Sequence, residues 1–204
     1  MLSVSNLSCT RGERTLFSGV SFDLKPGQWL HLEGSNGSGK TSLLRIATGF
    51  TPPSHGCVSW KGQPLTQVRG AFHTDLLYLG HALALKDELS ALENLQADAE
   101  IAGRAFVRTD AVASLQRLGL RARTRLPVRV LSQGQKRRVA LARLMLQDAP
   151  LWVLDEPFVA LDAQAQDLVA EALSAQVQRG GMVLFTSHQA VALQGRGERY
   201  RLNA

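Results

Sequence analysis

Residues 34–41 read Gly34-Ser35-Asn36-Gly37-Ser38-Gly39-Lys40-Thr41, which fits the pattern G-x-x-x-x-G-K-[ST] at every fixed position. The preceding residues 29–33 are short and mostly apolar, as in a buried strand, and residues 42–47 have the apolar spacing of a helix. Glycines let backbone N–H groups curl around an anion, and the helix start adds the positive end of its dipole. The stretch therefore predicts a phosphate-binding loop in which Lys40 reaches the β- and γ-phosphates and Thr41 holds Mg²⁺.

The bulk composition is that of a globular domain. A chain of 204 residues is long enough for one well-packed domain with an inserted subdomain, and its 45% hydrophobic and 20% charged residues are ordinary values. There is no membrane-spanning apolar run and no signal-peptide pattern, so we expect the chain to stay in the cytosol. Cys9 and Cys57 belong to no C-x-x-C pair and are expected to be reduced thiols with packing roles. The absence of C-x-x-C-H argues against covalently attached haem.

The net charge of +6 is concentrated in one segment. Between Asp110 and Asp148 there is no acidic residue, and the basic residues there are Arg117, Arg121, Arg123, Arg125, Arg129, Lys136, Arg137, Arg138 and Arg143. Such a block is compatible with nucleic acid, an anionic phospholipid surface, an acidic partner, or simply a solvated helical face. Aromatic residues are absent from the block, which argues against binding of single-stranded nucleic acid by base stacking. We expect no nucleic-acid partner, and contact with anionic lipid headgroups is a hypothesis.

Apolar periodicity predicts strands that alternate with helices along the chain. The expected strands are residues 4–8, 20–24, 29–33, 57–60, 76–79, 151–154 and 182–186. The expected helices are residues 42–47, 90–119 with a capping box at Ser90 and Glu93, 133–147, and 162–179. This alternation indicates an α/β fold with a parallel sheet, whose active residues gather at the carboxyl ends of the strands. The helical block at residues 89–147 interrupts the alternation and is interpreted as an insertion.

Two carboxylates follow the apolar residues 151–154. An apolar strand that ends in an acid is typical of a buried parallel strand with a Mg²⁺-coordinating group, which assigns Asp155 to the metal. Glu156 lies one residue further and points elsewhere, so it is the candidate to accept a proton from the attacking water. Many strands end at an Asp without any such role. The upstream phosphate loop favours the catalytic interpretation.

Residues 131–135, Leu-Ser-Gln-Gly-Gln, open a helix with Ser132 as its N-cap. The basic residues Lys136, Arg137 and Arg138 follow in the first turns, where the helix dipole disfavours them. The misfit indicates a compensating anion or acidic neighbour, and a nucleotide phosphate supplied by another subunit would fit. On periodicity alone, a solvated basic helix is the alternative.

Four segments together resemble the ATP-binding subunits of ABC transporters: residues 34–41, residues 131–135, Leu154-Asp155-Glu156-Pro157 and Thr186-Ser187-His188. The resemblance covers essentially the whole chain. It implies the P-loop NTPase fold, with a RecA-like parallel core and an N-terminal antiparallel part in residues 1–81 and 149–204, and an inserted α-helical subdomain in residues 82–148. It also implies a homodimer in which each ATP lies between one phosphate loop and the partner's signature helix.

The resemblance also implies roles for individual residues. Catalysis is expected from Glu156 and His188 together with Lys40, and Mg²⁺ is expected at Thr41 and Asp155. The residues expected to contact ATP within the subunit are Gly34, Ser35, Asn36, Gly37, Ser38, Gly39, Lys40, Thr41 and Ser42. From the partner copy, the expected contacts are Ser132, Gly134, Gln135 and, in the inter-subunit loop, Asp162.

Three positions depart from the family's pattern. Gln133 stands where glycine is common, while the neighbouring serine and second glycine are kept. The glutamine that usually links Mg²⁺ to the membrane partner falls at His81, or at Ala82 if one residue is skipped. The aromatic residue that usually stacks on adenine falls at Arg11, whose guanidinium can also lie flat on a base.

Within the family, three further stretches resemble the branch that serves bacterial cytochrome c maturation, the haem exporter ATPases. These are Tyr78-Leu79-Gly80-His81, residues 92–95 and residues 135–144. The branch implies a peripheral protein on the cytoplasmic face of the inner membrane that couples ATP hydrolysis to haem export or to release of a haem-loaded chaperone. Its implied partners are an integral membrane permease subunit and haem-handling proteins. The alternatives are a soluble ABC ATPase acting on ribosomes or DNA, and a transporter subunit for another cargo.

Overall fold

The computed structural model describes residues 1–202 and divides the chain into two units. The core unit holds Met1–His81, Ala149–Pro157 and the described residues from 173 onward, and the helical unit holds Ala82–Asp148 and Phe158–Ala172. This division differs from the expected one at residues 158–172, which lie with the helical unit. The reason is local: Arg138 of that unit binds Asp162 at 2.6 Å, so the start of the last helix is held there.

The core unit contains a five-stranded, fully parallel sheet in the order β6-β7-β8-β3-β9. The strands are β6 (Leu76–Leu79), β7 (Leu151–Leu154), β8 (Met182–Thr186), β3 (Gln28–Glu33) and β9 (Arg196–Arg201). Every residue of β7 and β8 is buried, in keeping with sequences that are apolar except for Thr186 at the end of β8. β9 was not expected, because its sequence Arg-Gly-Glu-Arg-Tyr-Arg is charged, as suits an edge strand.

A second, antiparallel sheet in the core unit has the order β2-β1-β4-β5. Its strands are β1 (Leu2–Arg11), β2 (Arg14–Leu24), β4 (His55–Trp60) and β5 (Gln63–Pro64). β1 and β2 are longer than expected because their solvent-facing Ser, Thr and Arg side chains give no apolar signal. The two sheets confirm the expected parallel core with an N-terminal antiparallel part.

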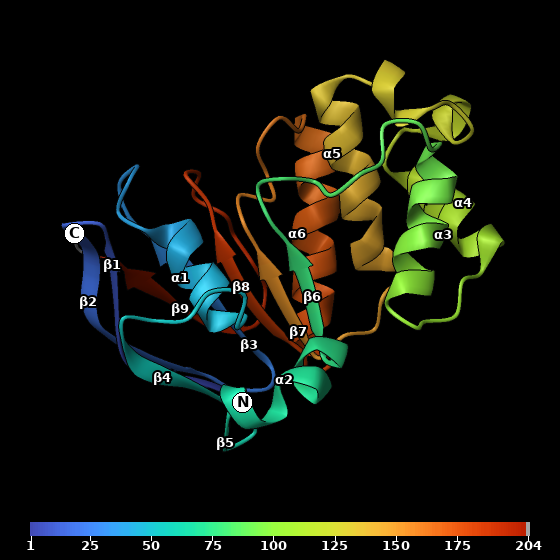
Figure 1. Cartoon of the computed structure of the whole chain (residues 1–204). Helices are drawn as coiled ribbons and strands as arrows, with labels where there is room; N and C mark the ends of the chain where they lie inside the picture. The colour runs from blue at the N-terminus through green and yellow to red at the C-terminus, as the bar shows by residue number, and fades with distance from the viewer. Residues whose placement is uncertain (203–204) are drawn as a thin grey trace. The chain divides into compact units, whose positions relative to one another are not determined.

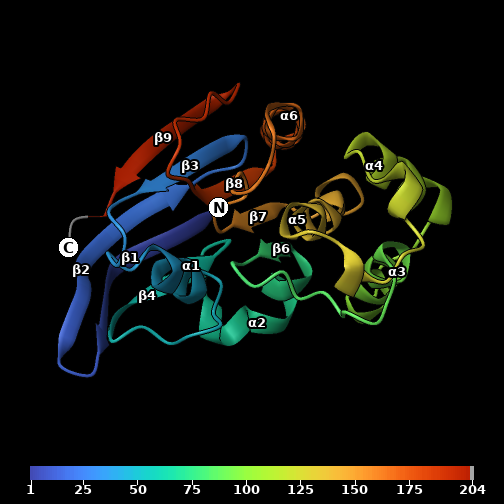
Figure 2. The same ribbon diagram turned by 90° about the horizontal axis from the view of Figure 1, so that it is seen from above.

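Helix α1 (Lys40–Ala47) lies between the two sheets, as both ribbon views show (Figures 1 and 2). Its buried side chains Leu43, Leu44 and Ile46 belong to one hydrophobic cluster that also contains residues of both sheets. The burial anchors the helix start, and therefore the preceding loop, at the carboxyl end of β3. Helix α2 (Leu65–Thr74) was not expected, because only Leu65 and Phe72 in it are buried and its periodicity is weak.

The helical unit contains α3 (Ala91–Ile101), α4 (Arg108–Arg117), α5 (Gln133–Leu141) and the first ten residues of α6 (Ala163–Gln178). Short 3₁₀ turns lie at Arg121–Arg123, Val128–Val130 and Ala142–Met145. The expected capping box is present: Glu93 N–H donates to Ser90 Oγ at 3.2 Å, and Ser90 N–H to Glu93 Oε2 at 2.7 Å. The expected single helix over residues 90–119 is wrong, since Gly103, with φ of 64°, separates α3 from α4.

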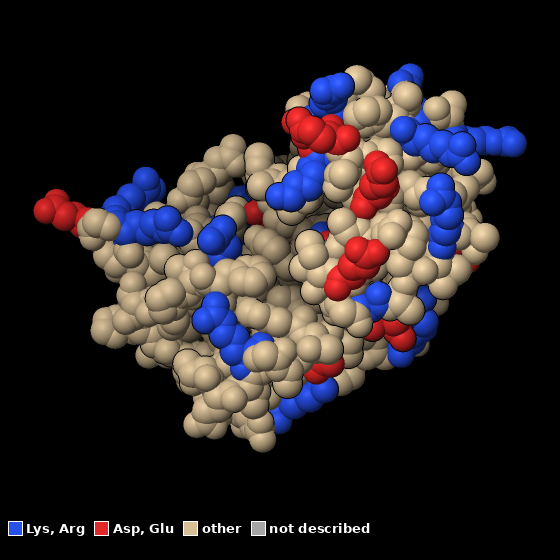
Figure 3. Space-filling view, turned by 45° about the vertical axis from the view of Figure 1, so that its right-hand side comes forward, with Lys and Arg blue, Asp and Glu red and all other residues tan. Residues whose placement is uncertain are grey.

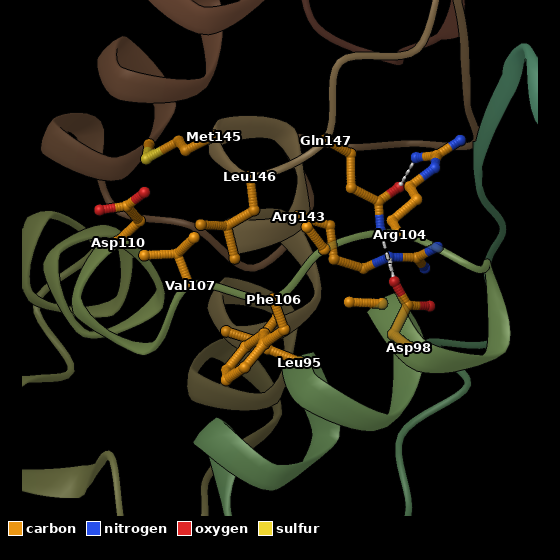
Figure 4. Close-up of a pocket in the computed structure, with 12 residues that line it drawn as sticks. Leu95, Asp98, Arg104, Phe106, Val107, Asp110, Arg143, Met145, Leu146 and Gln147 are labelled. Atoms are coloured by element: carbon orange, nitrogen blue, oxygen red, sulfur yellow. Dashed lines mark hydrogen bonds and ion pairs between the residues drawn. The ribbon is translucent and has the colours of Figure 1, made fainter.

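A polar network lines a pocket of about 110 Å³ in the helical unit (Figure 4). Arg143 Nε lies 2.8 Å from Asp98 Oδ2, and Arg104 Nη1 donates to Gln147 Oε1 at 2.6 Å. Burial lowers the pKa of Arg143, and the Asp98 carboxylate opposes that shift. Asp98 therefore compensates a largely desolvated guanidinium.

Replacing Asp98 by alanine is expected to lower the free energy of unfolding by about 3 kcal/mol, because it leaves a buried positive charge without its carboxylate. Urea titration followed by circular dichroism measures this. Asp87→Ala is the matched control: it removes the carboxylate of the Lys136 ion pair, but Asp87 is 56% exposed, and its loss is expected to cost about 1 kcal/mol or less. Equal effects of the two variants would contradict the account.

Candidate functional site

The loop of residues 34–39 joins the carboxyl end of β3 to the start of α1. Lys40, the first residue of the helix, is 8% exposed, and its ammonium folds back to donate to Gly34 O at 2.8 Å and Ser35 O at 3.2 Å. The first-turn amides of α1 have no carbonyl four residues earlier within the helix. The loop thus gathers N–H donors and a lysine at one helix start, an arrangement suited to a polyphosphate.

Two features of this loop stand out: one position accepts only glycine, and one buried hydroxyl lacks a hydrogen-bond partner within residues 1–202. A Cβ on Gly34, with φ of 157°, would lie 2.7 Å from Ser38 Oγ and 3.1 Å from Leu202 O, so only glycine fits. Ser38 is 1% exposed, and its hydroxyl has no hydrogen-bond partner within residues 1–202. A buried hydroxyl of this kind requires a partner, and a phosphate oxygen would provide one.

Asp155 follows β7 directly, and its side chain meets the phosphate-loop helix. The carboxylate is 3% exposed, and its Oδ2 accepts a hydrogen bond from Thr41 Oγ1 at 2.8 Å. A hydroxyl and a carboxylate are hard oxygen ligands of the type that Mg²⁺ takes, together with water and substrate phosphates. Within residues 1–202 no group of three or more His, Cys, Asp or Glu side chains is placed to hold a metal ion.

Glu156 and His188 lie side by side at the same edge of the parallel sheet. His188 N–H donates to Glu156 Oε2 at 3.2 Å, and His188 Nε2 lies 3.4 Å from Glu156 Oε1. The Glu156 side chain is 13% exposed, and the His188 side chain is 50% exposed. Glu156 has φ of 53°, a left-handed conformation that is uncommon outside glycine and concentrates at functional sites.

Two residues at this edge were missed as candidates. Thr186 ends β8, and its buried hydroxyl contacts both Asp155 and the backbone of Glu156. His31 of β3 is 3% exposed, stacks on Phe185 with 4.6 Å between ring centroids, and places Nε2 3.1 Å from Ser187 O. Because a carbonyl only accepts, this nitrogen is the donor. A threonine and a histidine inside apolar strands give no sequence signal of these contacts.

The start of α5, in the helical unit, holds a separate group of candidate residues. Ser132 is exposed, and its capping box with Gln135 is formed by hydrogen bonds of 3.3 Å and 3.0 Å. A Cβ on Gly134 would lie 2.8 Å from Ala160 O, so glycine permits close packing of the start of α5 against the backbone that precedes α6. An anion or an acidic neighbour was expected to compensate the basic first turns of α5. The structure shows acidic neighbours: Lys136 pairs with Asp87 at 2.7 Å, and Arg138 pairs with Asp162 at 2.6 Å.

The remaining candidate residues are placed as follows. Arg11 ends β1 opposite Arg14 and is exposed. His81 is exposed and follows β6, whose last residue Leu79 pairs with Leu154, so it lies at the same edge as Asp155. Ala82 begins the helical unit. Asp162 caps α6 by accepting from Ala165 N–H at 3.0 Å, and this bond and Arg138 lower the pKa of its carboxyl.

The sequence matches the ABC transporter family over residues 17–159. The match spans more than half of the chain and includes the phosphate loop, the tip of α5, and the two carboxylates after β7. The chain belongs to the ABC transporter family. It is an ABC-type ATPase and binds ATP.

Relatives of known role resemble this ABC ATPase over nearly their full length. The cytochrome c biogenesis ATP-binding export protein CcmA of Dechloromonas aromatica is 51% identical over 94% of both chains. The protein of the same name from Methylococcus capsulatus is 47% identical over 95% of this chain and 94% of its own.

Solved structures agree with the fold. A bacterial ABC transporter cassette solved as a dimer is 25% identical, covers 93% of this chain and 88% of its own, and superposes with a TM-score of 0.80. A dimeric post-hydrolysis state of an ATP-binding cassette with ADP and phosphate is 23% identical over 93% of this chain and 88% of its own, with a TM-score of 0.82. The second likeness establishes the fold alone. Together they confirm the expected ABC cassette architecture.

Proposed function

We propose that this chain is the ATP-hydrolysing subunit of a bacterial ABC transporter complex that serves c-type cytochrome biogenesis, through haem export or release of a haem-loaded chaperone. The observation that supports this most strongly is the 51% identity to a cytochrome c biogenesis export protein over 94% of both chains. An ABC subunit for a different cargo would keep the same site residues, because cargo choice rests with the membrane partner. The identity over nearly the full length favours the cytochrome branch.

In the proposed mechanism, the phosphate loop of residues 34–39 and Lys40 bind the phosphates of ATP through backbone amides and the ammonium, and Ser42 belongs to the same helix start. Thr41 and Asp155 would hold Mg²⁺, which neutralises charge on the phosphates when bound. The Glu156 carboxylate accepts a proton from the attacking water. His188, within 3.4 Å of Glu156, orients that carboxylate and the γ-phosphate.

We further infer that two copies pair head to tail, so that Ser132, Gly134 and Gln135 of one copy meet the γ-phosphate bound by the other. The exposure of Ser132 supports this, since its side chain is available to a neighbour. The helix start at Ser132 has no acidic residue in its first turn, so its positive dipole end is available to a phosphate. Asp162 would lie in the loop between the two copies.

Two assignments concern the departures from the family pattern. His81, at the carboxyl end of β6, is proposed to take the place of the usual glutamine near the metal, with Ala82 as the alternative. Arg11 is proposed to lie on the adenine ring, since a guanidinium stacks on aromatic faces. Both residues are exposed and available for such contacts.

For the cellular setting, we propose peripheral attachment to the cytoplasmic face of the inner membrane through an integral permease subunit, together with haem-handling maturation proteins. Within residues 1–202 no helix is long and apolar enough to cross a bilayer. The basic segment between Asp110 and Asp148 is proposed to contact anionic lipid headgroups. Figure 3 shows Lys and Arg side chains interspersed with Asp and Glu on the face in view, so that face has no unbroken basic surface.

Deletion of the gene in its native host tests the function. We expect covalently bound haem in c-type cytochromes, detected by haem staining of denatured proteins, to disappear while b-type cytochromes remain. Wild-type protein supplied in trans should restore the staining, and a Glu156→Gln variant at equal abundance should not. Unchanged c-type cytochromes in the deletion strain would overturn the cytochrome assignment while leaving the ATPase assignment intact.

A further inference from the structure

We propose that Thr186 is a positioning residue for ATP hydrolysis, whose hydroxyl fixes the orientation of the metal-binding carboxylate and of the general base at the same time. The inference rests on the proposed roles of Asp155 and Glu156. It assigns a task to a side chain at the end of an apolar strand, whose hydroxyl is hydrogen-bonded to Asp155 and to the backbone of Glu156.

The fold places Thr186 at the centre of the carboxyl edge. It is the last residue of β8, the middle strand of the five, and it pairs with Leu32 of β3. On its other side, Leu154 of β7 pairs with Phe185 of β8. Asp155 and Thr186 are the residues that follow this pair, so they lie next to each other. Thr186 is 0% exposed, and no solvent competes for its hydroxyl.

The directions of its two hydrogen bonds are fixed by chemistry. The amide N–H of Glu156 only donates, so Thr186 Oγ1 accepts from it, at 2.8 Å. The hydroxyl proton is then given to Asp155 Oδ1, also at 2.8 Å. Asp155 Oδ2 accepts from Thr41 at 2.8 Å. Each oxygen of the Asp155 carboxylate therefore faces a defined hydroxyl, and the carboxylate is fixed with Oδ2 toward the phosphate-loop helix.

The same hydroxyl holds the backbone of Glu156. That residue has φ of 53°, a conformation that L-residues adopt only when surrounding contacts enforce it. The bond from its N–H to Thr186 is such a contact. The Glu156 side chain carried by this backbone faces His188, whose backbone N–H donates to Glu156 Oε2 at 3.2 Å.

Packing alone does not require a hydroxyl at this position. The four preceding residues of β8, 182–185, are apolar and buried, and valine would fill the same volume there. Valine would leave the Glu156 N–H without this acceptor and Asp155 Oδ1 without this donor. Because outer partners of metal ligands orient those ligands, their loss typically costs 10- to 100-fold in metal affinity or activity.

The test compares Thr186→Val, which removes the hydroxyl, with Thr186→Ser, which keeps it. With a fluorescent ADP analogue, we expect the Mg²⁺ concentration for half-maximal binding to rise about 10-fold in Thr186→Val, while nucleotide affinity in EDTA stays within about 2-fold. The kcat of ATP hydrolysis should fall about 10- to 100-fold. Thr186→Ser should stay near the wild-type values in all three measurements.

Thr48→Val is the matched control, because Thr48 is also 0% exposed but donates only to carbonyls of α1, Leu44 O and Arg45 O. It should lower thermal stability without changing the Mg²⁺ dependence. If Thr186→Val lacks a folded circular dichroism spectrum, Thr186→Cys replaces it, since a thiol is only a weak donor.

If Thr186→Val has wild-type Mg²⁺ dependence and kcat, the inference is wrong while the proposed function stands. The same holds if Thr186→Ser is as impaired as Thr186→Val. The same change of Mg²⁺ dependence in Thr48→Val would show a merely structural effect and overturn it too. A wild-type chain that neither binds nor hydrolyses ATP would instead overturn the proposed function, and this inference with it.

Discussion

Replacing Glu156 by glutamine is expected to lower the rate of ATP hydrolysis by about 10³-fold while ATP binding stays within about 3-fold of wild type. Glutamine keeps the shape of the side chain and can still face His188, but an amide does not accept a proton from water. In the proposed mechanism the phosphates are bound by residues 34–40, which the substitution leaves unchanged. Phosphate release under single-turnover conditions and equilibrium ATP binding measure the two quantities.

Glu33→Gln is the matched control, because Glu33 ends β3 at the same sheet edge and its carboxylate faces His31 and Arg199 instead of His188. We expect this variant to hydrolyse ATP at a rate within about 3-fold of wild type, since it removes no group that acts on water. Wild-type turnover in Glu156→Gln would show that another group accepts the proton. Loss of ATP binding in that variant would show that Glu156 has a role in binding.

Replacing Ser132 by arginine is expected to reduce turnover by at least about 10²-fold without weakening ATP binding to the single chain. In the proposed head-to-tail pairing, arginine at the tip of α5 places bulk and positive charge where the neighbouring copy approaches. The phosphate loop of the same chain is unchanged, so its own affinity is retained. ATPase assays across a range of protein concentrations, together with equilibrium binding at low concentration, check both parts.

Ser132 also caps α5, and the stability effect of its loss has to be separated from the effect on turnover. Ser90→Ala removes the same type of capping box from α3 and should cost about 1 kcal/mol of stability without lowering turnover. Ser132→Thr retains a capping hydroxyl and should remain active. If Ser132→Arg hydrolyses ATP like wild type, the tip of α5 does not face a nucleotide.

The parts that the sequence predicts well are those where one strong pattern coincides with burial. The short runs at residues 151–154 and 182–186, apolar except for Thr186, are strands buried at every position. The loop at residues 34–41 was located because its glycines and Lys40 have a fixed spacing. The structure then brings two of the predicted residues together, since Thr41 Oγ1 donates to Asp155 Oδ2 at 2.8 Å.

The parts that remained hidden depend on tertiary contacts. β9 is recognisable only from its pairing with β3, since its own side chains are charged. α2 has a kink at Val68, where φ is −121°, and two buried residues give no clear period. In the sequence, Thr186 and His31 are ordinary strand residues. Only the folded sheet shows that Thr186 contacts Asp155 and that His31 contacts the carbonyl of Ser187. Helical spacing alone does not tell which anion compensates Arg138. The folded chain brings Asp162 to within 2.6 Å of its guanidinium, so the carboxylate comes from the same chain.

The central claim is that ATP joins two copies of the chain between a phosphate loop and the tip of α5. The most direct test is light scattering on the purified Glu156→Gln variant, which should hold ATP without consuming it, in the presence and absence of MgATP. The account predicts a mass near 22.2 kDa without nucleotide and twice that value with MgATP, and no such increase when Ser132→Arg is added to the same chain. A mass that stays near 22.2 kDa with ATP bound, or a dimer that forms despite Ser132→Arg, would contradict it.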